Sequence, residues 1–407
     1  MDSDIFLLSI SGHDKPGLTS ALTAVLAEYG ANVLDIGQAN IHDTLSLGIL
    51  FQIKSGKKSA AVLKDILFKS YELGIKAKFK PISLEDYEKW VNLQGKDRYI
   101  ITLLGEKLTA EQISRVTKVI SEKNLNIDAI KRLTGRFSLV KEDDYPRSSI
   151  QLSIRGEIKD KSEFTEKFMA ISSELNLDIA FQEDNIFRRN RRLVCFDMDS
   201  TLIQTEVIDE LAELAGVGKQ VKAITESAMQ GEIDFQESFK KRMQLLKGLK
   251  EEVLEEVALN LPITKGARRL IDTLKSYGFK TAILSGGFTY FGKYLQKDLG
   301  IDYVYANELE IKDGVLTGGY IGEIVDGNKK AEYLKKIALK EGIDINQTIA
   351  VGDGANDLPM LNLAGLGIAF HAKPKVKDNA QSSISSIGLD GVLYLLGYHD
   401  RHIDLID

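Results

Sequence analysis

The chain has 407 residues, of which 28% are charged and 43% hydrophobic, and its net charge at pH 7 is −6. A chain of this length exceeds one ordinary hydrophobic core, so we expect roughly two to four domains. It has no apolar run of about 18 or more residues, and its negative charge does not attract nucleic acid, so neither a membrane nor a nucleic acid is an expected partner.

Two stretches before residue 185 have the same predicted order of elements. In the first, residues 5–11 alternate like a strand and apolar residues from 18 to 26 recur at helical spacing, followed by two strands, a second amphipathic helix and a last strand. The second stretch repeats this order from residue 99 to residue 183. Each stretch predicts a small βαββαβ domain with its helices on one face of an antiparallel sheet, and we place these domains at residues 1–82 and 97–184.

Beyond residue 190 the pattern changes to continuous apolar runs separated by helical segments. The runs RLVCFD, KTAILSGG, DYVYAN, TIAVGDG and LGIAF are typical of buried strands, and they predict an α/β domain at residues 190–407 with a parallel sheet covered on both faces. Residues 204–262 have a helical pattern throughout and are too long for one crossover helix. We interpret them as an inserted cap that covers the end of the sheet.

The compartment is inferred from the N-terminus and the single cysteine. MDSDIFLLSISGHDKPG places acids before a short apolar stretch and lacks the basic leader of a secretory signal. Cys195 has no disulfide partner in the chain, and its apolar neighbours favour a buried core residue. We therefore expect a cytoplasmic protein. The basic run RRNRR at 188–192 is interpreted as a solvated linker.

Acidic, small and basic residues follow the predicted strands of the α/β domain. Asp197 and Asp199 are two positions apart at the end of the first strand, so both can face one side, although this pair alone fits a solvated turn equally well. The residues that accompany them at other strand ends or helix starts are Ser285, Gly286, Lys330, Asp353 and Asp357. Ligands of parallel sheets bind beyond the carboxyl ends of the strands, so this combination predicts a site.

DMDST, the SGG strand end, a lysine before a helix and GDGAND, in that order, resemble the four motifs of the haloacid dehalogenase (HAD) superfamily. From about residue 190 to 395, the segments DMDSTLIQTEVIDELAELAG, FQESFKKRMQLLKGL, AILSGGF and VGDGANDLPML resemble the phosphoserine phosphatase family. The resemblance implies a HAD-type Rossmann-like sheet with a helical cap. It also implies Mg²⁺-dependent hydrolysis of O-phospho-L-serine to L-serine and phosphate, the final step of serine biosynthesis.

The resemblance assigns the acidic residues to catalysis and metal binding. Asp197 would be the nucleophile that forms an aspartyl phosphate, and Asp199 would give a proton to the leaving serine oxygen. Mg²⁺ would bind the side chains of Asp197 and Asp353 and the backbone carbonyl of Asp199, with Asp357 supporting them.

Other residues are assigned to the phosphoryl group in the same way. Ser285, the Gly286 amide and Lys330 would stabilise its equatorial oxygens, and Asn356 would orient the phosphate or the attacking water.

The cap would select the substrate. By resemblance, Glu206 meets the substrate ammonium and Arg242 pairs with its carboxylate, a contact that suits a guanidinium. Met229 and Phe235 match apolar positions of the same cap. From the residues alone, Glu206 fits equally well as an acid at a helix N-terminus, and Arg242 as a surface residue.

The first βαββαβ stretch, with HDKPGLTSAL followed by EYGANVLDI, resembles ACT domains, which bind amino acids and associate through their sheets. Asp14 and Gly17 precede a helix N-terminus whose N–H groups can hold a carboxylate. The resemblance therefore implies an L-serine effector site there, and a homodimer. The second stretch, with GEKLTAEQI, lacks the Pro-Gly pair, so ligand binding there stays open and either domain could serve assembly alone.

Two alternatives stay open at this point. The same catalytic residues could hydrolyse another small phosphomonoester or transfer the phosphoryl group to an alcohol. The chain could also be an amino-acid sensor whose α/β domain is inert, although its intact acidic motifs argue against this.

Overall fold

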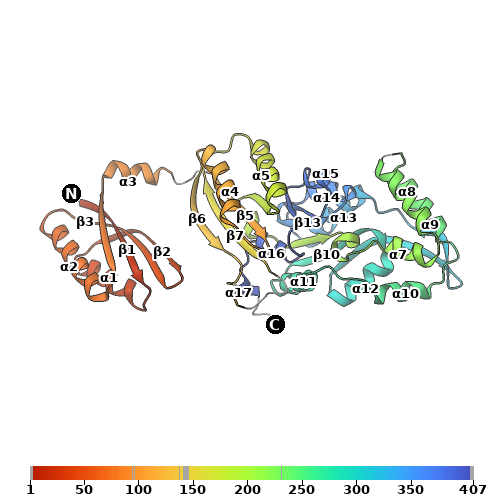
Figure 1. Ribbon diagram of the computed structural model, residues 1–407, viewed down its shortest axis with the longest axis horizontal. Helices are drawn as coiled ribbons and strands as arrows, with labels where there is room; N and C mark the ends of the chain where they lie inside the picture. The colour runs from red at the N-terminus through yellow and green to blue at the C-terminus, as the bar shows by residue number, and fades with distance from the viewer. Residues whose placement is uncertain are drawn as a thin grey trace. The chain divides into compact units, whose positions relative to one another are not determined.

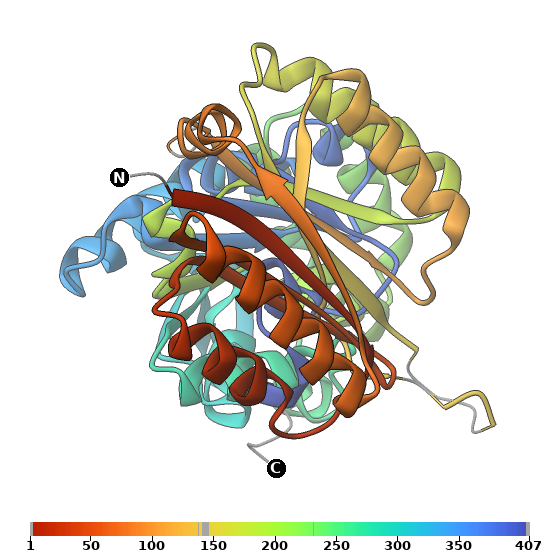
Figure 2. The same cartoon turned by 90° about the vertical axis from the view of Figure 1, so that its left-hand side faces the viewer.

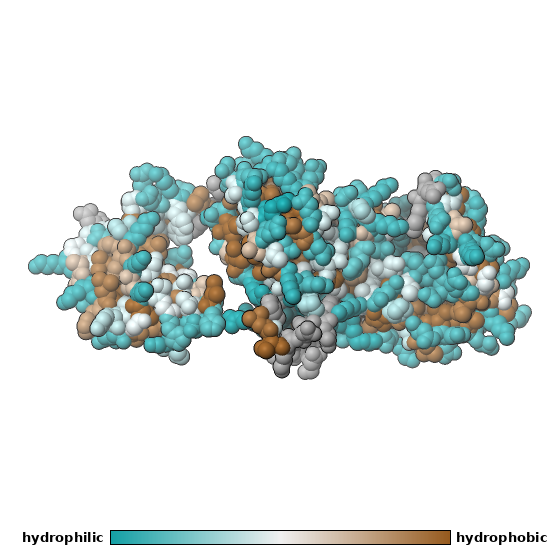
Figure 3. Space-filling model, viewed as in Figure 1, coloured by the Kyte–Doolittle hydropathy of each residue, from teal (hydrophilic) through white to brown (hydrophobic). Residues whose placement is uncertain are grey.

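The computed structural model describes residues 3–403 except 94, 96, 137, 141–145 and 231, and divides into two compact units, Met1–Lys96 and Asp97–Asp407. Hydrophilic residues cover much of the face of both units seen in Figure 3, with smaller hydrophobic groups between them. Among the helices of this described part, none is both long and apolar enough to cross a membrane.

The first unit is a four-stranded antiparallel sheet with two helices on one face (Figures 1 and 2). Its elements are β1 (Ser3–His13), α1 (Leu18–Glu28), β2 (Asn32–Ile41), β3 (Thr44–Lys54), α2 (Lys57–Leu73) and β4 (Lys76–Ile82), followed by α3 (Leu84–Val91). The strand order is β2-β3-β1-β4. In β1, Leu8 and Ile10 are buried while Leu7 and Ser9 are not, because the helices cover only one face of the sheet.

The second unit begins with a domain of the same βαββαβ order. Its elements are β5 (Arg98–Gly105), α4 (Ala110–Glu122), β6 (Asn126–Arg132), β7 (Ser148–Arg155), α5 (Lys161–Leu175) and β8 (Asp178–Glu183), in the strand order β6-β7-β5-β8. Every residue of β5 after Arg98 is buried. The cause is that the α/β domain covers the sheet face opposite α4 and α5: Leu104 and Ala180 belong to the same hydrophobic core as the α/β domain.

Two buried aspartates join this domain to the α/β domain. Asp178 accepts hydrogen bonds from the backbone N–H groups of Ser385 and Ser386, both at 2.8 Å. Asp400 accepts from the backbone N–H of Gly135 at 2.6 Å and from the hydroxyl of Tyr394, also at 2.6 Å. Together with the shared core, these bonds make residues 97–403 one packed body.

The α/β domain is built on a seven-stranded sheet of order β12-β11-β10-β9-β13-β14-β15. Its strands are β9 (Leu193–Phe196), β10 (Lys280–Phe288), β11 (Tyr303–Lys312), β12 (Val315–Ile321), β13 (Thr348–Gly352), β14 (Leu366–Phe370) and β15 (Ser382–Ile384). All are parallel except β12, an antiparallel edge strand that the sequence prediction omitted. The hairpin turn before it, Asp313-Gly314, has positive φ at both residues, as such tight turns require.

Helices cover both faces of this sheet. They are α11 (Ala267–Ser276), α12 (Thr289–Leu299), α13 (Gly327–Lys340), α14 (Leu358–Leu363), α15 (Pro374–Lys377), α16 (Gly391–Leu395) and α17 (Asp400–Ile403). Alternate residues of β9 enter different layers: Val194 and Phe196 belong to the core on one face, and Leu193 and Cys195 to the core on the other. Cys195 is therefore a buried core residue, as predicted, and burial raises the pKa of its thiol.

The cap consists of α7 (Val207–Leu214), α8 (Gly218–Gln230), α9 (Phe235–Leu245) and α10 (Glu252–Leu259), which lie together at one end of the sheet in Figure 1. Phe239 of α9 contacts Phe288 of β10 and Tyr320 of β12 through its ring. The cap is thus packed directly on the strands that lead to the sheet edge.

The interpretation of RRNRR as a solvated linker is wrong for two of its arginines. The run begins inside the short helix α6 (Ile186–Arg189) and continues beyond its end, and Arg188 and Arg191 are both 8% exposed. Arg191 donates to the carbonyl of Thr348 at 3.2 Å, so the start of the central sheet supplies an acceptor for it. A dense run of like charge suggested solvent exposure, but individual arginines can bury their stems against a neighbouring domain.

Candidate active site

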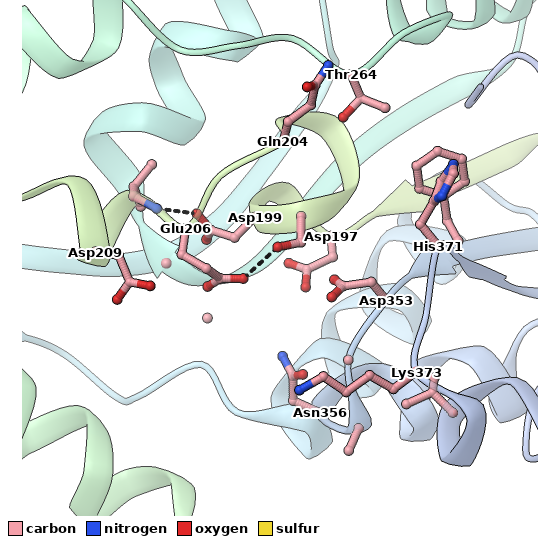
Figure 4. Close-up of a pocket in the computed structure, with 18 of the residues that line it drawn as sticks. Asp197, Asp199, Gln204, Glu206, Asp209, Thr264, Asp353, Asn356, His371 and Lys373 are labelled. Carbon is pink, nitrogen blue, oxygen red and sulfur yellow. Dashed lines mark hydrogen bonds between the residues drawn. The ribbon is translucent and has the colours of Figure 1, made fainter. Parts of the chain in front are cut away.

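Polar residues meet at one edge of the seven-stranded sheet because they follow neighbouring parallel strands. β9 lies between β10 and β13; Asp197 and Asp353 directly follow β9 and β13, and Ser285 lies in the carboxyl half of β10. Asp197 and Asp353 line a pocket of about 1440 Å³ between the sheet edge and the cap. Figure 4 shows them in this pocket with Asp199, Glu206 and other lining residues.

Asp197 and Asp199 are placed by a loop and not by the pleat of a strand. β9 ends at Phe196, and the backbone N–H of Asp197 then donates to the carbonyl of Val351 in β13 at 2.8 Å. Asp199 accepts from the backbone N–H of Val207, the first residue of the cap helix α7, at 2.8 Å. These bonds therefore fix the backbone of Asp197 against the sheet and the carboxylate of Asp199 against the cap.

Lys330 lies between two of the carboxylates. It is fully buried in the first turns of α13, and its Nζ is 2.9 Å from Asp197 Oδ1 and 2.7 Å from Asp357 Oδ1. Asp357 also accepts from the backbone N–H of Gly354 at 3.0 Å. Burial alone would lower the pKa of Lys330, but the two adjacent carboxylates outweigh it and hold that pKa above its ordinary value.

The Ser285-Gly286-Gly287 segment is an irregular part of β10 beside Asp199, where the pairing with β11 shifts register. The backbone N–H of Gly287 donates to Ser285 Oγ at 2.8 Å, and the Ser285 hydroxyl lies 3.4 Å from Asp199 Oδ2. A Cβ on Gly287 would come within 2.4 Å of Asp199 Oδ2, so only glycine fits there. Ser285 is itself fully buried, with its hydroxyl near the carboxylate of Asp199.

The carboxylates of this site repel one another in an environment of low polarity. Burial raises the pKa of Asp197, with further repulsion from Asp357. Burial and the charge of Glu206 raise the pKa of Asp199 to about 8, and burial raises the pKa of Asp353 to about 7. One lysine does not neutralise the negative charge of so many carboxylates, so a further cation would stabilise the site.

A divalent metal fits this group of acids. One carboxylate oxygen each from Asp197, Asp353 and Asp357 lies within 4.8 Å of the others. All three donors are oxygens, the ligands that Mg²⁺ prefers. Thr201 donates to Asp353 Oδ1 at 3.3 Å and so orients one of them.

The cap brings Glu206 and Arg242 to the same pocket. Glu206 precedes α7 and is exposed to the solvent of the pocket, while Arg242 in α9 is half-buried; both line the pocket wall. Although the side chain of Glu206 opens onto the pocket, the surrounding protein partly desolvates its carboxylate and raises its pKa; desolvation also lowers the pKa of Arg242. Phe235 also lines the pocket, next to Gly286, whereas the side chain of Met229 lies outside the described part of the chain.

Three segments of the chain match known domain families. Residues 4–80 and 98–182 match ACT domains, and residues 194–362 match haloacid dehalogenase-like hydrolases. A phosphoserine phosphatase of Mycobacterium tuberculosis is 37% identical over 402 residues, which cover 98% of this chain and 95% of that protein. The chain belongs to the phosphoserine phosphatase family.

Other members of the family and a solved hydrolase support this assignment. A phosphoserine phosphatase of Streptomyces coelicolor is 38% identical over 407 residues, which cover 100% of this chain and 95% of that protein. A probable phosphoserine phosphatase from Vibrio cholerae has a TM-score of 0.58 at 36% identity, covering 77% of this chain and 90% of that one. A HAD family hydrolase from Salmonella enterica serovar Typhi has a TM-score of 0.62 at 32% identity, and the match covers 74% of this chain and 98% of that one. The predicted fold class, a HAD-type domain after two ACT domains, is confirmed.

The two ACT domains differ where an amino acid would bind. In the first, α1 begins after Gly17, which has φ 90° and gives no side-chain cap, so the first N–H groups of the helix have no capping side chain. Asp14 lies beside this turn and accepts a hydrogen bond from Asn40 at 2.5 Å. In the second, Thr109 and Gln112 cap α4 reciprocally and use these N–H groups.

The sequence prediction did not include some residues that shape the phosphatase site. Asn307 of β11 is buried, donates to the carbonyl of Gly286 at 2.8 Å and accepts from the N–H of Val325 at 2.8 Å. Ser200, which is part of the DMDST motif, donates to Glu206 Oε1 at 2.8 Å. The sequence did place Asn307 at the carboxyl end of a predicted strand, which is where site residues gather. Its role could not be predicted, because its partners come from segments distant in the sequence.

Proposed function

We propose that this protein hydrolyses O-phospho-L-serine to L-serine and phosphate through an aspartyl phosphate on Asp197. The observation that supports this most is the meeting of two groups in one pocket. Asp197 with the buried Lys330 suits phosphoryl transfer. Glu206 and Arg242 of the cap offer the opposite charges that an amino-acid ammonium and carboxylate require. The name carried by full-length relatives is consistent with this substrate.

The proposed metal is Mg²⁺. The side chains of Asp197 and Asp353 and the backbone carbonyl of Asp199 would hold it, and Asp357 would keep Lys330 in place beside them. When bound, the ion offsets the negative charge of the carboxylates and the phosphate and polarises a phosphoryl oxygen.

The residues of the site then divide the reaction between them. A carboxylate oxygen of Asp197 attacks phosphorus, the bond to the serine oxygen breaks, and Asp199 gives that oxygen a proton. A pKa of about 8 suits a carboxyl group that is protonated near neutral pH. Asp199 next takes a proton from water as the water attacks phosphorus, which releases phosphate and restores Asp197.

Other residues would stabilise the phosphoryl group during this transfer. Lys330, the Ser285 hydroxyl and the Gly286 amide would stabilise its equatorial oxygens, and Asn356, which lines the pocket, would orient the phosphate or the water. The positions of Lys330 beside Asp197 and of Ser285 beside Asp199 support this.

Arg242→Ala tests the substrate assignment. We expect kcat/KM for L-phosphoserine to fall about 10- to 100-fold, because a charge-assisted contact is lost, whereas that for phosphoethanolamine, which lacks the carboxylate, changes far less. The control is Lys241→Ala, an exposed neighbour paired with Glu237 at 2.7 Å. Equal losses on both substrates, or faster wild-type turnover of a phosphomonoester without amino-acid groups, would contradict the assignment.

We also propose that L-serine regulates the enzyme by binding near Asp14 and Gly17 in the first ACT domain. The open N-terminus of α1 supports this, since it can hold a carboxylate. Calorimetric titration of L-serine into the full-length protein should give heat at millimolar concentrations or below, and Asp14→Ala should reduce it. No heat in the wild type would refute the effector site.

The proposal also includes the compartment, the pathway step and the oligomeric state of the enzyme. It would act in the cytoplasm, in the last step of serine biosynthesis, as a homodimer. Light scattering on the purified protein tests the dimer: a monomer mass at micromolar concentration would refute it.

A further inference from the structure

Ser200 holds an unusual backbone conformation at the centre of the site. Its φ is 55° and its ψ is 5°, in the left-handed region that favours glycine. The residue lies directly between Asp199 and the short segment that leads into the cap helix α7. Strain of this kind at a site points to a role for the residue that bears it.

The contacts of Ser200 lead to the cap and not to the sheet. Its hydroxyl donates to Glu206 Oε1 at 2.8 Å, and its backbone N–H donates to the carbonyl of Thr205 at 3.3 Å. The adjacent Asp199 accepts from the N–H of Val207 at 2.8 Å. Residues 199–200 therefore hold residues 205–207 through three hydrogen bonds, and Figure 4 shows Asp199 and Glu206 side by side on the pocket wall.

The hydroxyl of Ser200 engages only one of the two carboxylate oxygens of Glu206. The side chain of Glu206 is exposed to the pocket, so the other oxygen can accept from a ligand there. An exposed glutamate has several rotatable bonds, and fixing it before a ligand arrives reduces the entropy lost on binding. The bond also fixes the orientation of Glu206 relative to Asp199, two residues that serve different groups of the substrate.

We propose that Ser200 is a positioning residue for substrate selection, which holds Glu206 where it meets the substrate ammonium. The proposal rests on the proposed function, because it assumes that Glu206 binds that ammonium. It also gives the strained conformation a role, because the residue that bears it makes the hydrogen bond to Glu206.

The test compares two substrates that differ only in the ammonium. These are L-phosphoserine and 3-phosphooxypropanoate, in which hydrogen replaces the amino group. The variants are Ser200→Ala and Ser200→Gly, both of which lack the hydroxyl. We expect the ratio of kcat/KM for L-phosphoserine to that for the analogue to fall about tenfold in both variants, mainly through KM for L-phosphoserine.

The two variants separate the hydroxyl from the backbone. Glycine adopts the left-handed conformation without strain, so Ser200→Gly should unfold at a temperature at least as high as Ser200→Ala. If Ser200→Gly kept the wild-type substrate ratio while Ser200→Ala lost it, backbone strain and not the hydroxyl would matter, and the proposal would be wrong.

Glu206→Gln separates this proposal from the proposed function. If Glu206→Gln lowers the substrate ratio and both Ser200 variants keep it, Glu206 binds the ammonium without help from Ser200, and the positioning role is refuted. If Glu206→Gln also leaves the ratio unchanged, the assignment of Glu206 itself fails. A lowered ratio in all three variants supports both.

Discussion

At the scale of single residues, the site depends on side chains that touch no substrate. Asn307 joins three segments, since its amide lies between the carbonyl of Gly286 and the N–H of Val325. Thr201 orients Asp353 in the same indirect way. Such residues set the positions of the Ser285–Gly287 segment of β10 and of the Asp353 carboxylate, which the proposed phosphoryl transfer requires.

Asn307→Ala should therefore affect both activity and stability. It leaves a buried carbonyl and a buried N–H without partners, each costing about 1–3 kcal/mol. We expect a lower unfolding midpoint in urea and a fall in kcat of at least about tenfold, because the Ser285–Gly287 segment of β10 loses its hydrogen bond from Asn307. Asn328→Ala, at an exposed position in the first turn of α13, serves as the control. A normal kcat in Asn307→Ala would contradict this role.

Gly287→Ala should abolish most activity without unfolding the protein. The added Cβ would lie 2.4 Å from Asp199 Oδ2 and 2.8 Å from the end of Met198, so Asp199 must move. A displacement of this size can cost about 100-fold in rate. Gly37→Ala is a matched control, because a Cβ there meets nothing within 4 Å. If both variants kept wild-type kcat, the close approach at Gly287 would have no catalytic role.

The sequence indicated the residue types of the site because they follow strands in a recognisable order. Asp197, Ser285 and Asp353 could be placed at one sheet edge from the strand pattern alone. The directions in which Asp197 and Asp199 point could not be predicted in this way, because a loop after β9 orients them and not the pleat of a strand. Ser200 and Asn307 were missed because their partners are defined only by the folded loop and by segments distant in sequence.

At the scale of elements, the two βαββαβ domains use their sheets differently. The alternating pattern of β1 and the continuous apolar pattern of β5 were both visible in the sequence as IFLLSIS and YIITLL. The second pattern signals a sheet buried on both faces, which the structure explains by the α/β domain packed against it. The edge strand β12 was missed, although its Asp-Gly turn was a usable signal.

Asp400 provides a test of the junction between the second ACT domain and the α/β domain. Burial would raise its pKa, but hydrogen bonds from Tyr394, Gly135 and Arg269 outweigh burial and hold the pKa below its ordinary value. A lowered carboxyl pKa contributes stability above the unfolded-state pKa of about 3.9, and this stability is lost as the pH falls through the folded-state pKa.

Asp400→Asn should thus destabilise the protein at pH 7 by about 2–4 kcal/mol, because it leaves Arg269 and the Gly135 N–H poorly matched. The difference from the wild type should begin to shrink below about pH 4, where the carboxyl of the unfolded state is protonated, and should shrink further as the pH falls through the lower folded-state pKa. Thermal unfolding of the wild type and Asp400→Asn at pH 7 and below about pH 4 measures this difference in stability, and the exposed Asp298→Asn is the control. A difference that is the same at both pH values would contradict the account.

At the scale of the whole molecule, the proposed metal ligands and the substrate-binding residues proposed in the cap line one pocket. Removing divalent metal with EDTA should abolish phosphate release, and Mg²⁺ should restore it, because the acids of the site need a cation. Since the metal would bind only the folded protein, Mg²⁺ should also raise the melting temperature of the wild type. Asp353→Asn should lose most of that increase; full activity in EDTA would refute the metal site.

The architecture of the whole molecule could be predicted because each domain has its own pattern of strands and helices. How the second ACT domain joins the α/β domain could not, since it depends on single buried contacts such as those of Asp178 and Asp400. Glu106 of that ACT domain even lines the catalytic pocket, which the order of elements does not suggest.

The most direct measurement is phosphate release from L-phosphoserine with Mg²⁺, by the wild type and by Asp197→Asn. The account predicts that the wild type hydrolyses L-phosphoserine with a higher kcat/KM than other phosphomonoesters. It also predicts that Asp197→Asn, which keeps the size of the side chain but removes the nucleophile, loses at least about a thousandfold in kcat. Wild-type turnover by Asp197→Asn would contradict the central claim.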